Sequence, residues 1–219
     1  MADNLPVVIV GAGGHGRVIY DSLRHMGTKV LGFLDTNKPI GTKVRDLTVI
    51  GHHSDVLKYS DRAEIIIGIG DNWIRSEMRR QLLEISPNIL FGKAIHPSAV
   101  ISKDVLIGSG TVVMAGAVIN TATKIGEHAI INTSASIDHD CEIGEFSAIQ
   151  PGAVLGGEVN LGEFCTIALG ARVIHGIKIG SHTVIGAGAT VLKNLPAFSV
   201  AYGSPAKVIR SRKSSDTYL

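Results

Sequence analysis

An aliphatic residue returns at every sixth position from Ile95 to Val191, seventeen times without a slip. Four residues after each of them stands Ala, Cys, Ser, Thr or Val, with Ile177 and Leu195 as the exceptions. This period is typical of a parallel β-helix, in which each hexad forms one flat side and three sides close a turn. Turns of eighteen residues then stack as parallel strands about 4.8 Å apart. The pattern therefore predicts almost six turns without an inserted loop.

The same period decides how two other features are interpreted. Residues 105–123 carry no charge, which meets the length test for a membrane helix. Because this segment keeps the six-residue phase and contains Asn120, we assign it to the β-helix. Cys141 and Cys165 both occupy the inward small position but lie one turn plus one side apart. We therefore expect two packed thiols that point from different sides, and no disulfide.

The first part of the chain follows another pattern, in which strands alternate with helices. The sequence predicts buried strands over 6–10, 29–34 and 64–69, and helices from the glycine loop to about Met26 and over Trp73–Ile85. This alternation predicts a parallel α/β sheet. Roughly ninety residues make only half of a dinucleotide-binding fold. We expect three parts: a half-Rossmann-like α/β domain over 1–92, a hexapeptide-repeat β-helix over 93–195, and a C-terminal cap and basic tail over 196–219.

A glycine loop, Gly11-Ala12-Gly13-Gly14-His15-Gly16, follows the first strand and opens the first helix. Asp35 lies nineteen residues after Gly16, at the end of the next strand. Glycines let the backbone approach a phosphate, and the free N–H groups of the helix N-terminus favour its charge. The loop predicts a site for a nucleotide diphosphate, with a plain strand–helix turn as the alternative. A dehydrogenase is not expected, because the second mononucleotide half is absent.

The triplet Asp138-His139-Asp140 lies at a predicted corner of the β-helix, outside its core. A neighbouring carboxylate can fix the tautomer of an imidazole and raise its basicity, so His139 is a candidate general base. Gly157 stands one turn above it, where a glycine leaves backbone N–H groups open to an oxyanion. The alternative is a solvated surface histidine.

A metal site is not expected from the histidines. His139 and His175 are two turns apart, about 9.6 Å by strand spacing, which is too far to share a zinc ion. His52 and His53 begin a further predicted helix and are interpreted as structural or solvated.

Composition narrows the class of protein. Twenty-one Lys and Arg against nineteen Asp and Glu leave a net charge of +2, too balanced for a surface that binds nucleic acid or anionic membranes. The segment MADNLPVVIV lacks the features of a signal peptide, and two cysteines make no disulfide framework, which favours a cytoplasmic protein. The repeat stops at Leu195-Pro196, and the remaining C-terminal residues are expected to cap the solenoid. The basic residues among them could also meet an anionic cofactor.

Taken in order, the motifs resemble those of the hexapeptide-repeat acyltransferases that modify bacterial surface sugars. They are GAGGHG after the first strand, FLD ending at Asp35, IGIGDNxxR over Ile67–Arg75, IHPSA at the start of the solenoid, INTSASIDHDCEIGEF around His139, and GSPAK near the end. The likeness is closest to sialic acid O-acetyltransferases and to nucleotide-linked 4-amino-sugar N-acetyltransferases of the bacillosamine and perosamine pathways. It implies a left-handed solenoid and a homotrimer with acetyl-CoA in the cleft between neighbouring chains.

The resemblance also implies roles for single residues. His139 matches the catalytic base, Asp140 the acid that raises its basicity, and Gly157 the backbone donor near the thioester oxygen. Leu169 and Ala187, one turn apart, match backbone contacts to acetyl-CoA. The positions that match sugar-nucleotide contacts are Gly13, Gly14, His15, Asp35, Thr36 and Gly70.

One position departs from the family pattern. Ala148 stands where the bacillosamine-type enzymes have a second histidine facing acetyl-CoA. We expect position 148 beside the cofactor, with the contact of that histidine missing or supplied by another group.

The resemblance and the residues together predict an acetyl-CoA-dependent N-acetyltransferase acting on the C4 amine of a nucleotide-linked sugar, UDP-linked of bacillosamine type or GDP-perosamine. The neutral amine would attack the thioester while His139 takes its proton and the backbone at Gly157 stabilises the oxyanion. No covalent intermediate is expected, because both cysteines face inward. Two alternatives stay open: a sialic acid O-acetyltransferase, and a non-catalytic trimer that binds nucleotide sugars.

Overall fold

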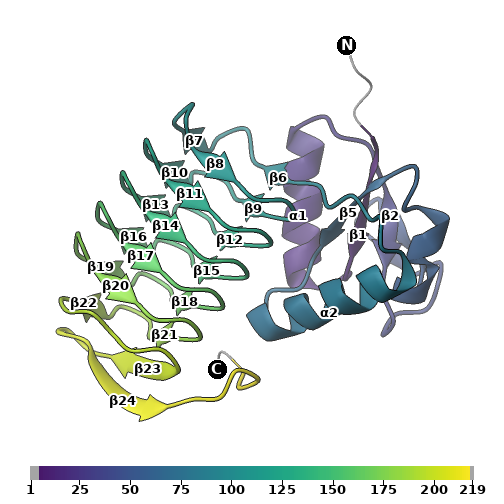
Figure 1. Ribbon diagram of the computed structural model, residues 1–219. Helices are drawn as coiled ribbons and strands as arrows, with labels where there is room; N and C mark the ends of the chain where they lie inside the picture. Colours follow the sequence, from purple (N-terminus) through teal and green to yellow (C-terminus); the bar gives the residue numbers. More distant parts are fainter. Residues whose placement is uncertain (1–4, 218–219) are drawn as a thin grey trace.

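The computed structural model describes residues 5–217 and places an α/β domain beside a three-sided solenoid (Figure 1). The sheet of the small domain has the order β3-β4-β2-β1-β5, parallel except for the β3–β4 pair. Its elements are β1 (Val7–Val10), α1 (Gly14–His25), β2 (Val30–Leu34), β3 (Lys43–Val44), β4 (Leu47–Gly51), the 3₁₀ helix η1 (His53–Lys58), β5 (Glu64–Ile67) and α2 (Asn72–Ile85).

Both faces of this sheet are buried, as a parallel α/β sheet requires. Alternate residues of β1 serve opposite faces. Val7 and Ile9 pack in one apolar cluster with α1, whereas Val8 and Val10 pack in another with Leu82 of α2. The three predicted strands and two predicted helices are confirmed, with ends shifted by up to two residues.

The antiparallel hairpin formed by β3 and β4 was not predicted. Its turn places Arg45 at a φ of 59°, in the left-handed region that glycine or asparagine usually occupies. Without such a residue the sequence carries no turn signal. The helix expected at His52-His53 is the short η1.

Seventeen two-residue strands, β6 to β22, form the three sides of the solenoid. The six-stranded sheet contains β7 (Val100–Ile101), β10 (Val118–Ile119), β13 (Ser136–Ile137), β16 (Val154–Leu155), β19 (Arg172–Val173) and β22 (Thr190–Val191). The five-stranded sheet contains β8 (Leu106–Ile107), β11 (Lys124–Ile125), β14 (Glu142–Ile143), β17 (Asn160–Leu161) and β20 (Lys178–Ile179). The eight-stranded sheet contains β6 (Ala94–Ile95), β9 (Val112–Val113), β12 (Ile130–Ile131), β15 (Ala148–Ile149), β18 (Thr166–Ile167), β21 (Val184–Ile185), β23 (Ser199–Tyr202) and β24 (Lys207–Ser211).

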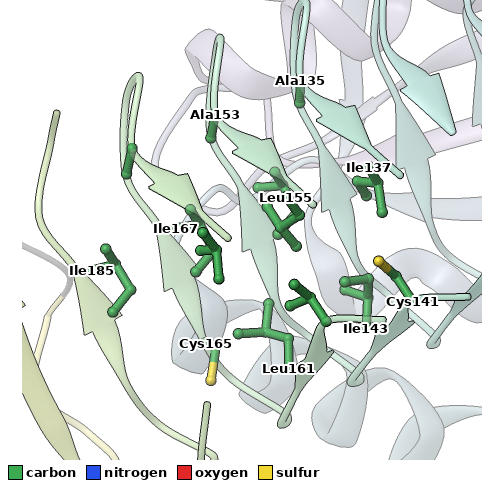
Figure 2. Close-up of a cluster of buried hydrophobic side chains, with 14 of the residues drawn as sticks. Ala135, Ile137, Cys141, Ile143, Ala153, Leu155, Leu161, Cys165, Ile167 and Ile185 are labelled. Atoms are coloured by element: carbon green, nitrogen blue, oxygen red, sulfur yellow. The ribbon is translucent and has the colours of Figure 1, made fainter. Parts of the chain in front are cut away.

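The register confirms the predicted turn of eighteen residues. Ile119 pairs with Ile137, which pairs with Leu155, all in parallel. The aliphatic anchors fill the interior of the solenoid, as Figure 2 shows for Ile137, Leu155 and their neighbours. Residues 105–123 are part of these turns. No helix among residues 5–217 has both the length and the apolar character needed to cross a bilayer.

The two cysteines lie where the repeat predicts them. Cys141 and Cys165 are buried, free thiols of the solenoid core. Burial raises the pKa of Cys165 to about 12 and also raises that of Cys141. Neither thiol is an available nucleophile at neutral pH.

The regular register ends at Leu195. This residue bridges to Ile179, sixteen residues earlier rather than eighteen. β23 then continues the eight-stranded sheet beside β21, and β24 folds back on β23 in antiparallel pairing. These two strands cover the last turn.

The small domain docks on the outer surface of the eight-stranded sheet (Figure 1). Met114, Ile130 and Ala148 are at most 2% exposed there and share an apolar cluster with Ile19 and Leu23 of α1. The other two sheets do not contribute to this contact cluster.

The core predicts a large stability effect for one anchor. Ile149→Ala removes a fully buried side chain and should lower the free energy of unfolding by about 2–5 kcal/mol. Lys178→Ala, at an exposed position of the neighbouring five-stranded sheet, should change it by less than about 0.5 kcal/mol. Urea denaturation at one protein concentration measures both. Equal effects would contradict the inward assignment of the anchors.

Candidate active site

The predicted base lies at the corner between the six-stranded and five-stranded sheets. Residues 138–141 connect β13 to β14, with Asp140 at a φ of 56°. The Nδ1 atom of His139 is 2.8 Å from Oδ2 of Asp140, and both side chains are about half exposed. Because a carboxylate only accepts hydrogen bonds, Nδ1 carries the proton and Nε2 keeps its lone pair.

Acidic neighbours raise the pKa of His139. The hydrogen bond that His139 donates to Asp140 is the largest cause, with further contributions from the charges of Asp138 and Glu158. Asp138 is itself held in place, since its Oδ1 accepts hydrogen bonds from the His139 N–H and from Asn120 Nδ2, both at 2.9 Å. These hydrogen bonds lower the pKa of Asp138. The corner is thus built around a basic, oriented imidazole.

Gly157 lies directly against this imidazole. A Cβ at position 157 would come within 2.6 Å of both Cε1 and Nε2 of His139, so no other residue fits without moving the ring. Glu158 N–H donates to His139 O and Gly176 N–H to Gly157 O, whereas no backbone hydrogen bond among residues 5–217 uses the Gly157 N–H. A buried N–H without a hydrogen-bond partner among the described residues therefore lies beside the predicted base.

A pocket of about 440 Å³, here called the glycine-loop pocket, opens at the carboxyl ends of the strands of the small domain. All six positions matched to sugar-nucleotide contacts line it: Gly13, Gly14, His15, Asp35, Thr36 and Gly70. Gly16 has a packing role instead, because a Cβ there would lie 2.0 Å from the carbonyl oxygen of Gly11.

Asp35 holds the loop as well as lining the pocket. Its Oδ2 accepts the Ala12 N–H at 2.7 Å, and its Oδ1 accepts the Asn37 N–H at 2.8 Å. Next to it, Thr36 Oγ1 lies 2.5 Å from Nδ1 of His53, which also lines the pocket. His53 was interpreted as structural or solvated, and its approach to Thr36 has no sequence signal.

A second pocket of about 380 Å³ lies between the small domain and the solenoid and is here called the interdomain pocket. His15 and Gly70 line both pockets. Burial and the charge of Arg75 lower the pKa of His15 to about 4, so its ring is neutral at physiological pH. Its Nε2 atom is buried and has no hydrogen-bond partner among the described residues.

The solenoid side of the interdomain pocket carries polar residues to which the sequence motifs assigned no role. Asn132 and Gln150 each follow an anchor, stand one turn apart, and are joined by a 3.1 Å hydrogen bond from Nδ2 to Oε1. Thr166 lies on the adjacent turn. The spacing of eighteen residues between Asn132 and Gln150 was the sequence signal that could have placed them side by side.

The positions matched to acetyl-CoA separate into two environments. Leu169 and Ala187 are exposed and stacked at the corner between the eight-stranded and six-stranded sheets, where Gly188 N–H donates to Leu169 O. Ala148 is fully buried against the small domain. This burial does not favour Ala148 as a cofactor contact, because its methyl group lies in the apolar cluster shared with the small domain and not at the surface.

The chain alone does not bring these groups together. His139 lies at one corner of the triangle, whereas Leu169, Ala187 and the interdomain pocket lie at or beside another, one full side away. Nor do residues 5–217 contain a group of three His, Cys, Asp or Glu side chains placed to hold a metal ion.

Comparison with known proteins gives matches to both parts of the chain. The model of the PglD N-terminal domain matches residues 6–82, and that of the bacterial transferase hexapeptide (six repeats) matches residues 122–157.

Solved structures that resemble nearly the whole chain include two that contain CoA or acetyl-CoA. PerB from Caulobacter crescentus, in complex with CoA and GDP-perosamine, is 38% identical, with a TM-score of 0.85 over 93% of this chain and 96% of that one. The acetyltransferase domain of PglB from Neisseria gonorrhoeae, in complex with acetyl coenzyme A, is 31% identical. Its TM-score is 0.87, and the match covers 94% of this chain and 100% of that one.

Curated sequences match over shorter segments. UDP-N-acetylbacillosamine N-acetyltransferase of Bacillus subtilis is 35% identical over 124 residues, which are 50% of this chain and 51% of that enzyme. An uncharacterized protein of Acanthamoeba polyphaga mimivirus is 33% identical over 110 residues, 21% of its length. The chain therefore spans about half, or less, of the curated relatives it matches.

The site predicts a change in proton affinity that needs no substrate. Asp140→Asn removes the main cause of the raised pKa of His139, so the titration midpoint should move to lower pH. Glu158→Gln removes a smaller contribution and should move it less. NMR titration of the His139 ring protons measures both. An unchanged midpoint in Asp140→Asn would contradict the assigned hydrogen bond.

Proposed function

Because the chain belongs to the family of hexapeptide-repeat, CoA-dependent sugar N-acetyltransferases, we propose that it acetylates the C4 amine of a nucleotide-linked amino sugar with acetyl-CoA. The relatives named for their reaction transfer an acetyl group to nitrogen, which favours this reaction over O-acetylation of sialic acid. The PerB structure contains GDP-perosamine and the Bacillus subtilis enzyme is named for a UDP-linked sugar, so both nucleotides belong to the proposal.

One observation carries the proposed chemistry: an oriented imidazole lies against a glycine whose N–H has no hydrogen-bond partner among the described residues. The hydrogen bond from His139 Nδ1 to Asp140 leaves Nε2 as the proton acceptor, next to Gly157. Direct acyl transfer needs such a base for the attacking amine and a donor for the oxyanion.

The reaction then proceeds in two proton transfers. The neutral amine attacks the thioester carbonyl carbon, and Nε2 of His139 takes the proton that the nitrogen loses. The negative charge on the carbonyl oxygen is stabilised by the Gly157 N–H. Collapse of the tetrahedral intermediate breaks the carbon–sulfur bond, and His139 returns its proton to the departing thiolate of CoA. The acidic surroundings that raise the pKa of His139 stabilise its protonated form between these steps.

The small domain would hold the nucleotide part of the substrate. The glycine-loop pocket offers the backbone of Gly13 and Gly14 at the N-terminus of α1 to the diphosphate. Gly70 and the neutral His15 line both pockets, which suits a sugar that continues from one pocket into the other.

The separation of the base from the predicted cofactor contacts supports a site shared between chains. His139 of one chain would meet the Leu169 and Ala187 corner of its neighbour, and a homotrimer closes this arrangement by symmetry. The six-stranded sheet contributes no described residue to the apolar docking cluster, and it exposes Val100 and Val154. Such apolar side chains suit a contact between solenoids packed side by side.

The same proposal places the enzyme in the cytoplasm and its product in surface-polysaccharide biosynthesis. It rests on the resemblance to enzymes that modify surface sugars.

Loss of the base is the first kinetic prediction. His139→Asn should lower kcat by about 10²–10⁴-fold, because the proton acceptor is gone. His175→Asn, in the same column of corner residues two turns away, should stay within a few-fold of the unmutated chain. Release of CoA thiol from acetyl-CoA measures both. Turnover of His139→Asn within a few-fold of the unmutated chain would remove the base assignment.

The acceptor is identified by the same assay with a panel of substrates. UDP-4-amino sugars, GDP-perosamine and free or CMP-linked sialic acid are compared at equal concentration. We expect rapid thiol release with one of the amino sugars. Thiol release with sialic acid alone would show that the chain is an O-acetyltransferase instead. If calorimetry detects no binding of acetyl-CoA, the chain is better explained as a non-catalytic protein.

Gly157→Ala tests the contact beside the base. Its methyl group would meet the ring of His139 at 2.6 Å and displace it. We expect kcat to fall about 10²-fold or more, as for loss of an oxyanion donor. Gly13→Ala is the control for the general effect of an added methyl group on folding, because its Cβ position has open space around it. Gly170→Ala would not serve as this control, because Gly170 has a positive φ that strains any residue with a side chain. Full activity of Gly157→Ala would contradict the proposed geometry.

A further inference from the structure

Arg75 is a fully buried cation that joins the small domain to the solenoid. It lies near the start of α2 and is 1% exposed. A guanidinium has five N–H donors, and here each has an acceptor. Nε donates to His128 O at 2.9 Å, Nη1 to Ile69 O at 3.0 Å and Gly70 O at 2.9 Å, and Nη2 to Asn72 Oδ1 and Phe146 O, both at 2.9 Å.

The acceptors belong to the wall of the glycine-loop pocket and to the solenoid, two parts whose relative position the proposed reaction requires to be fixed. Ile69 and Gly70 form part of the wall of the glycine-loop pocket. His128 and Phe146 are consecutive members of a corner column of the solenoid, both with positive φ and with rings stacked 5.1 Å apart. One rigid side chain therefore connects the pocket wall to two turns of the solenoid.

Other groups also hold the two parts of the chain together. Met114 and Ile130 share an apolar cluster with residues of α1, and Arg79 of α2 forms an ion pair with Glu127 at 3.4 Å. Arg75 hydrogen-bonds to four carbonyl groups and one amide but to no carboxylate, and its burial lowers its pKa to about 9. A buried charge without an ion-pair partner is costly, and an apolar residue often packs as well or better. What the guanidinium adds is a fixed geometry, because its donors point in set directions.

A neighbouring amide makes the same connection. Asn72 accepts from Arg75 and uses its Nδ2 to donate to Cys165 O and Thr166 Oγ1, both at 3.1 Å. Arg75 and Asn72 together span three consecutive turns of the solenoid, through Phe146, His128 and the pair Cys165-Thr166.

We propose that Arg75 is a positioning residue that sets the place of the glycine-loop pocket on the solenoid, so that the sugar of a bound nucleotide sugar meets the acetyl group. This inference rests on the proposed function. The small domain holds one reactant while the solenoid supplies the base and the contacts to the other. Reaction across such a junction is sensitive to errors of about 1 Å.

Arg75→Lys tests the proposal. Lysine keeps the charge but has three donors on one atom, so it cannot reach all five acceptors. With the nucleotide amino sugar as acceptor, we expect kcat to fall at least about tenfold, while KM for acetyl-CoA stays within about twofold. Calorimetry with acetyl-CoA should give an unchanged number of sites per chain, which shows that the protein remains folded. Arg80→Lys is the matched control, since Arg80 lies on the same helix but its partners within residues 5–217 are Glu77 and Glu84 of that helix.

A milder variant covers the case in which Arg75→Lys does not fold. Asn72→Ala removes one acceptor of Arg75 and two bonds to the solenoid, and should lower kcat about three- to tenfold with KM for acetyl-CoA again unchanged. Unchanged kcat in the folded variant would overturn the proposal. A fall in kcat matched by an equal loss of acetyl-CoA sites would also overturn it, by showing a purely structural role. An unmutated chain that binds acetyl-CoA but acetylates no amino sugar would instead refute the proposed function.

Discussion

The repeat of eighteen residues per turn is the constraint on which the rest of the structure depends. Because each residue lies above the one eighteen positions earlier, residues at the same position of the repeat form a column along the solenoid. The aliphatic anchors make a continuous core, and the outer row of the eight-stranded sheet makes the apolar surface that receives the small domain. Chemistry is placed by the same rule. Gly157 lies against His139 because it is one turn further along, and Leu169 and Ala187 are stacked for the same reason.

The columns of the solenoid were predictable from sequence, whereas contacts between the two parts of the chain were not. Periodicity alone located the strands, the inward cysteines and the pairing of His139 with Gly157. It could not reveal the bonds of Arg75, because four of its five acceptors are backbone carbonyls, which every residue carries. Position 148 was carried over from a family pattern, and its burial against the small domain depends on how the domains dock. The left-handed turn and the domain limits at residues 92 and 195 remain predictions.

Two histidines show how environment divides the chemistry. His139 is half exposed beside carboxylates, and its pKa is raised. His15 is partly buried near the cation of Arg75, with its Nε2 atom shielded from solvent, and its pKa is lowered to about 4. Opposite shifts of this kind separate two roles, proton transfer at His139 and neutral hydrogen bonding at His15. At neutral pH His139 is suited to exchange a proton, while His15 is suited to contact a polar group of the substrate without carrying charge. The guanidinium that connects the domains is therefore also one of the causes that keep His15 neutral.

The central claim is that the reacting groups belong to two copies of the chain, and mixing two inactive variants tests it most directly. His139→Asn lacks the base, and Gly14→Trp fills the glycine-loop pocket at a position where a Cβ meets no atom within 4 Å. The two variants carry different tags, are refolded together, and assemblies holding both tags are purified. In a mixed cyclic trimer one of the three sites combines an intact base with an intact pocket, so activity should return to about one third of the unmutated level. Mixed assemblies that bind acetyl-CoA but stay as inactive as either variant alone would contradict a site shared between chains.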